Sequence, residues 1–132
     1  MTRYIPRIDR VPPNILRIAI GRTYDVDYPQ KHAAVVFNRK GRIVCVGRNT
    51  QRPLRYTERG PGVGRGGHAE IMALTRRRLY HIHTLMLLVI RFNDQQFKNS
   101  LPCSLCRNII ESLGIPKVYY SIGDDNEYPY SR

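Results

Sequence analysis

The apolar positions of this chain fall into short runs separated by polar residues. Residues 33–37 and 43–46 form two such runs, and the polar residues 38–41 between them are typical of a β-hairpin turn. Residues 84–90 are almost continuously apolar, as in a strand that is buried on both faces. Residues 117–121 predict a fourth strand. A sheet that contains such a buried strand needs helices on both of its faces.

Three segments show the apolar spacing of helices. Asn14 can cap a first helix that extends to about residue 24, and the other two helices are predicted over 68–79 and 103–113. Gly114 follows the last of them and is a typical helix stop. Because this helix lies between two strands, we expect a parallel crossover. The pattern therefore predicts an α/β fold, a three-layer α/β/α sandwich.

At 132 residues the chain is expected to form one domain over residues 14–121. Residues 1–13 read as a basic N-terminal arm without a core of its own, and residues 122–132 as an acidic C-terminal tail. The apolar runs are too short to span a bilayer and no secretory segment opens the chain, so we expect a cytoplasmic protein that is not secreted and does not enter membranes.

Two motifs carry the candidate chemistry. His68 and Glu70 flank Ala69 in one, and Cys103 and Cys106 follow Pro102 in the other. One histidine and two cysteines supply three ligands for Zn²⁺, which leaves a fourth position open for water, as in catalytic zinc sites. Both motifs open predicted helices, whose N-terminal ends, together with the Zn²⁺ itself, are expected to lower the pKa of the thiols and keep both cysteines as thiolates. The order H-x-E…P-C-x-x-C is the pattern of zinc-dependent nucleobase deaminases.

On these motifs, the chain resembles the cytidine/deoxycytidylate deaminase superfamily over roughly residues 31–121. The resemblance implies a cytidine-deaminase-like sheet, here truncated at the C-terminal end. It also implies a zinc-dependent hydrolytic deaminase acting on the cytosine of a (deoxy)cytidine nucleoside or nucleotide, with Glu70 moving protons. Asn49, at the end of the second predicted strand, matches a residue that commonly contacts substrate in the superfamily, and Ala69 and Pro102 are expected beside it.

The charge of the chain indicates a second kind of function, the binding of a polyanion. The formal net charge is +12, and 18 of the 22 basic side chains precede residue 92. Arg52 and Arg55 lie in a Pro- and Gly-rich stretch before His68, where they can grip a phosphate or remain solvated. We therefore expect nucleic acid or another polyanion as a partner, and a homo-oligomer or larger assembly, although a basic exterior also simply favours solubility.

Alternative functions follow from this charge. The amino-acid sequences of residues 99–103 and 114–121 are similar to those of short deaminase-like proteins of large DNA viruses and phages. A second alternative is therefore a deaminase-fold module that binds nucleic acid or builds an assembly, for example a virus particle in the host cytoplasm. A third alternative is a deaminase of tRNA adenosine or of cytosine in nucleic acid.

Overall fold

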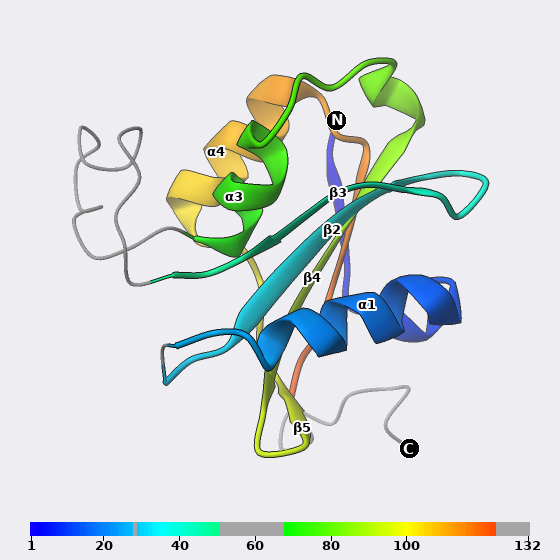
Figure 1. Cartoon of the computed structure of the whole chain (residues 1–132). Helices are drawn as coiled ribbons and strands as arrows, with labels where there is room; N and C mark the ends of the chain where they lie inside the picture. Colours follow the sequence, from blue (N-terminus) through cyan, green and yellow to red (C-terminus); the bar gives the residue numbers. More distant parts are fainter. Residues whose placement is uncertain (28, 51–67, 124–132) are drawn as a thin grey trace.

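A computed structural model describes residues 1–27, 29–50 and 68–123, and it shows one mixed sheet between helices (Figure 1). The strands run in the order β1-β6-β4-β2-β3, with β5 paired to β4. The elements are β1 (Arg3–Ile5), η1 (Ile8–Arg10), α1 (Pro13–Thr23), β2 (His32–Asn38), β3 (Ile43–Arg48), α3 (Ala69–Thr75), η2 (Ile82–Thr84), β4 (Leu85–Asn93), β5 (Gln96–Lys98), α4 (Ser104–Leu113) and β6 (Lys117–Tyr120).

The central strands follow the predicted pairing. β2 and β3 form an antiparallel hairpin, and β2 also pairs antiparallel with β4. The turn of the hairpin is held by Asn38, whose Oδ1 accepts hydrogen bonds from the backbone N–H of Lys40 and Arg42. β4 and β6 are parallel and are connected through α4, which confirms the expected crossover.

Helices cover both faces of the sheet, which confirms the α/β/α layering. α1 lies against one face, and α3 and α4 lie against the other (Figure 1). Alternate residues of β2 face opposite sides of the sheet. Ala33 and Val35 pack in the core cluster that includes residues of α1, whereas Ala34 and Val36 pack in the cluster that includes residues of α3 and α4. This division follows from the two-residue period of side chains along a strand.

The structure corrects the interpretation of the first 13 residues as an arm without a core. β1 pairs in parallel with β6, and Ile8 and Val11 are buried in the cluster on the α1 side of the sheet. β1 is thereby the edge strand of the sheet, next to β6. A three-residue strand among prolines has no readable periodicity, so its pairing with a strand more than a hundred residues away gave no sequence signal.

Two local boundaries also differ from prediction. The chain continues past the predicted strand at residues 84–90: β4 extends to Asn93, turns at Asp94 and Gln95, and returns as β5. Both turn residues have positive φ, 53° and 63°, as a tight hairpin turn requires. α3 ends at Thr75 rather than at Leu79, and Leu79 packs against the core from outside the helix.

Candidate zinc and catalytic site

Three ligand side chains meet at the N-terminal ends of α3 and α4. His68 is the N-cap of α3, Cys103 is the N-cap of α4, and Cys106 lies in the first turn of α4. Their ligand atoms all lie within 4.8 Å of one another. His68 Nδ1 is 3.7 Å from Cys103 Sγ and 3.4 Å from Cys106 Sγ. The fold thus brings together residues that are 35 and more positions apart in the sequence.

These separations fit a tetrahedral zinc ion. Zn–S bonds of about 2.3 Å and Zn–N bonds of about 2.05 Å, at tetrahedral angles, place a sulfur and a nitrogen ligand roughly 3.6 Å apart. The two measured distances lie on either side of this value. Three ligands also leave the fourth coordination position for water or substrate, as the two motifs predicted.

The thiols differ in their surroundings. Cys103 is exposed, whereas Cys106 is buried beside Glu70, and burial is the main factor that raises the pKa of the Cys106 thiol. The nearby charges of Glu70 and Cys103 raise it further. The prediction of lowered thiol pKa values concerns the zinc-loaded site, where the charge of Zn²⁺ adds to that of the helix ends. The positive charge of zinc is what favours a thiolate at Cys106.

Glu70 lies in the first turn of α3, two residues after His68, and is not one of the three candidate ligands. Its side chain is buried, at 6% exposure, and it contacts Cys106 through a hydrogen bond. Burial raises the pKa of Glu70 to about 7, because desolvation penalises the charged carboxylate more than hydrogen bonding favours it. A carboxyl group with a pKa near neutrality can both accept and donate a proton, which is the property that a general acid and base requires.

A family model described as "Cytidine and deoxycytidylate deaminase zinc-binding region" matches residues 15–122. The chain belongs to this family. The crystal structure of cytidine deaminase from Burkholderia pseudomallei has a similar fold, with a TM-score of 0.54, 18% sequence identity and coverage of 81% of this chain and 80% of that one. A search among curated proteins found no match. β1, at residues 3–5, precedes the region that the family model matches.

The contact between β3 and α3 sets the position of His68 and Glu70. A Cβ atom on Gly47 would lie 2.5 Å from the carbonyl oxygen of Ala69 and would also meet the backbone of Ala73. Only glycine permits α3 to pack this closely on the strand. Sequence analysis missed the role of Gly47, because nothing in its neighbouring residues indicates an approaching helix.

A buried pair of serines fixes the loop that leads to Cys103. Ser100 Oγ lies 2.9 Å from Ser121 Oγ and donates to the carbonyl oxygen of Val89 at 2.8 Å. Ser121 Oγ donates to Lys98 O at 2.7 Å, and its backbone N–H donates to Ser100 Oγ at 2.8 Å. The pair thereby connects β4, the end of β6 and the segment before the ligand Cys103. Polar serines in loops gave no sequence signal for this role.

The structure places the remaining predicted contacts as follows. Asn49 follows β3, where its Oδ1 accepts a hydrogen bond from His32 N at 2.9 Å and its Nδ2 donates to Gln30 O at 2.6 Å. Ala69 and Pro102 are buried next to the ligands in sequence. Pro102 precedes Cys103, the N-cap of α4. Substrate contact by these three residues stays a prediction.

Two predicted elements cannot be placed. Arg52 and Arg55 lie outside the described residues, as do residues 124–132 of the predicted acidic tail. In the part of the chain that the structure covers, no helix has the length and apolar character needed to cross a membrane.

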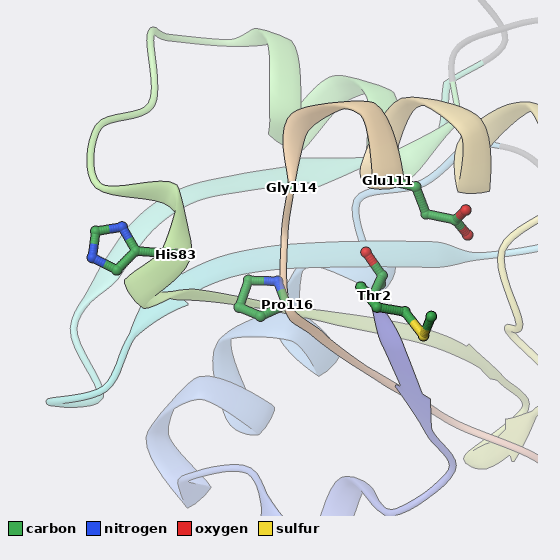
Figure 2. Close-up of a pocket in the computed structure, with 6 residues that line it drawn as sticks. Thr2, His83, Glu111, Gly114 and Pro116 are labelled. Carbon is green, nitrogen blue, oxygen red and sulfur yellow. The ribbon is translucent and has the colours of Figure 1, made fainter.

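A hollow of about 380 Å³ lies elsewhere, at the C-terminal end of α4 (Figure 2). It is lined by Met1, Thr2, His83, Glu111, Gly114 and Pro116. The zinc ligands lie at the opposite end of this helix, so the hollow is separate from the candidate catalytic site.

Proposed function

We propose that the protein is a zinc-dependent hydrolytic deaminase that acts on the cytosine of a (deoxy)cytidine nucleoside or nucleotide. The observation that carries this proposal is the buried carboxyl group of Glu70 beside the converging ligands His68, Cys103 and Cys106. A purely structural zinc site has no use for a desolvated carboxyl group next to the metal, and a fourth protein ligand is typical of such sites. Membership of the deaminase family agrees with this chemistry.

The proposed reaction consumes water and releases ammonia: a C–O bond forms at C4 of the base, and the bond from C4 to the exocyclic nitrogen breaks. Zinc, when bound, supplies the positive charge that lowers the pKa of a coordinated water. Glu70 accepts the proton of the attacking water and passes it to the ring nitrogen. Glu70 then takes the remaining proton from the hydroxyl group added at C4 and gives it to the departing amine, which leaves as ammonia. Its raised pKa, about 7, suits both directions of transfer.

Substrate contacts extend the proposal beyond the zinc site. Asn49, together with the backbone at Ala69 and Pro102, is proposed to hold the nucleoside. Arg52 and Arg55 are proposed to bind its phosphate, because guanidinium groups favour phosphate oxygens. Free cytidine nucleotides are intracellular metabolites, so this activity agrees with the cytoplasmic location expected from the sequence.

The decisive experiment replaces Glu70 by Gln. We expect the variant to retain zinc and its fold but to lose activity by about 10²- to 10⁴-fold, the usual contribution of a general acid–base group. Purified protein is incubated with cytidine, deoxycytidine, their monophosphates and single-stranded DNA or RNA, and ammonia release is measured. Glu111→Gln is the matched control, because Glu111 is exposed and lies near the far end of α4. Equal activity of Glu70→Gln and wild type would remove Glu70 from the mechanism.

A second candidate function is binding of nucleic acid, as a polymer substrate or within an assembly. A specific surface favours it: Arg76, Arg77 and Arg78 are exposed in succession after α3. The Arg78 guanidinium lies 5.9 Å from the ring centroid of Tyr80, which is itself 64% exposed. Exposed arginine next to an exposed aromatic ring suits phosphate contact combined with base stacking.

Filter binding of single-stranded DNA over a salt series tests this second candidate. Replacing Arg76, Arg77 and Arg78 by Gln is expected to flatten the log–log salt dependence by about 0.7 for each phosphate that the protein no longer neutralises. Arg17→Gln together with Arg22→Gln is the control, since both arginines are exposed on α1, across the sheet. Equal slopes for the triple variant and the control would exclude this surface as the binding site.

A further inference from the structure

One histidine that the proposed mechanism does not use faces the zinc site. His32 is the first residue of β2, and the two-residue period places it on the same side of the sheet as Ala34 and Val36. Those two residues pack with Ala69 and Ala73 of α3, the helix that His68 caps. The imidazole is half-buried, and the charges that act on it belong to Arg91 and His68. His32 therefore lies at the edge of the site.

The backbone of His32 is fixed by Asn49. Asn49 Oδ1 accepts a hydrogen bond from His32 N at 2.9 Å, and Asn49 N donates to His32 O at 3.3 Å. The side-chain amide and the backbone N–H of Asn49 thus hold the backbone at the start of β2, from which the imidazole extends. Asn49 and His32 form one unit at this edge of the sheet.

The ring nitrogens of His32, in contrast, have no hydrogen-bond partner among the residues that the structure describes. A ring nitrogen that loses water on burial without gaining a partner costs free energy. Its neutral form offers one N–H donor and one nitrogen acceptor. His32 is not in the cluster of ligand atoms formed by His68, Cys103 and Cys106. The ring nitrogens of His32 are therefore available to a bound ligand.

We propose that His32 is a specificity-determining residue, whose imidazole hydrogen-bonds a hydroxyl or carbonyl oxygen of the pyrimidine nucleoside, and that Asn49 positions it. This inference rests on the proposed deaminase function. It assigns to His32 a contact that an apolar residue at the same position cannot make.

A first test is independent of substrate. If the imidazole is kept for a ligand, His32→Leu removes an unpartnered polar group, so the melting temperature of the zinc-loaded protein is expected to stay the same or to rise. Zinc content is expected to remain that of wild type. Ser121→Ala is the contrasting variant, because Ser121 is a buried polar residue with several partners and its loss is expected to destabilise. A lower melting temperature or lost zinc in His32→Leu would show a structural or ligand role and overturn the proposal.

A second test follows the imidazole itself. The chain has four histidines, so the ¹⁵N spectrum of histidine-labelled protein is simple and is assigned with His→Gln variants. Deoxycytidine, deoxycytidine monophosphate and the product deoxyuridine are the probes. We expect the His32 resonances to shift on binding, while those of exposed His83 do not. A probe that binds with no change at His32 contradicts the contact.

Kinetics separate this inference from the proposed function. His32→Leu is expected to raise KM about three- to tenfold with little change in kcat, the effect of one hydrogen bond, whereas His32→Gln retains part of the affinity. His83→Gln serves as the control. Wild type that deaminates none of the candidate substrates refutes the proposed function. Wild type that is active while His32→Leu keeps the same KM refutes the role of His32 alone.

Discussion

The contact between Gly47 and α3 makes a sharp prediction, because added atoms there meet only backbone. A Cβ at residue 47 would lie 2.5 Å from Ala69 O and 2.9 Å from Ala73 Cα, whereas ordinary van der Waals contact begins at 3.4 Å. No side-chain rotation relieves backbone contacts. Gly47→Ala therefore has to move α3 away from β3 by roughly 1 Å, a shift of the size that overpacked cores undergo.

The size of the effect expected for Gly47→Ala follows from the tight packing of α3 and from the site residues at its start. Overpacking of this kind typically lowers the free energy of unfolding by about 1–3 kcal/mol. The same displacement moves the candidate zinc ligand His68 and the proposed general base Glu70, which lie at the start of the helix. A 1 Å misplacement of reacting groups costs on the order of 10²-fold in rate. Gly47→Ala should thus lose stability, zinc affinity and activity together, although residue 47 is not one of the candidate zinc ligands.

Urea unfolding, zinc competition against a chromophoric chelator, and ammonia release measure the three effects. Gly21→Ala is the matched control, because no atom lies within 4 Å of a Cβ at this exposed position of α1. Alanine in place of a helical glycine is expected to stabilise the protein by about 0.5–1 kcal/mol. A Gly47→Ala protein with the stability and zinc affinity of wild type would refute the argument that this contact positions α3.

Three further predictions concern the metal, the serine pair and the response to pH. Cys103→Ser is expected to abolish stoichiometric zinc in metal analysis, and a chelator should lower the melting temperature of wild type because the metal joins α3 to α4. Ser121→Ala should lower the free energy of unfolding by about 1–3 kcal/mol in urea and weaken zinc binding, since buried partners lose their hydrogen bonds. Burial, followed by the charges of Arg91 and His68, lowers the pKa of His32 to about 4, so the unfolded chain, with a pKa near 6.5, binds more protons between these values. Stability should therefore fall as pH decreases through this window, by about 2 kcal/mol between pH 7.5 and 5, and His32→Leu should remove that part of the pH dependence in urea unfolding.

The sequence by itself determined the features that depend on nearby residues. Two-residue alternation and turn residues located the hairpin of β2 and β3, and the apolar run at residues 84–90 located the central strand. The spacing of His68 and Glu70, and of Cys103 and Cys106, predicted the candidate ligands and the proposed general base, because helix geometry and metal chemistry constrain such short motifs.

Other features were decided only when distant segments met. β1 is ordered by pairing with β6, the loop before Cys103 by the hydrogen bonds of Ser100 and Ser121, and α3 by its close approach to Gly47. None of these residues is unusual among its neighbours in the sequence. Its role depends on a partner far along the chain, and backbone pairing, desolvation and steric contact between such partners exist only in the folded protein. For the same physical reason, the raised pKa of Glu70 and the unpartnered imidazole of His32 follow from burial and have no counterpart in the sequence pattern.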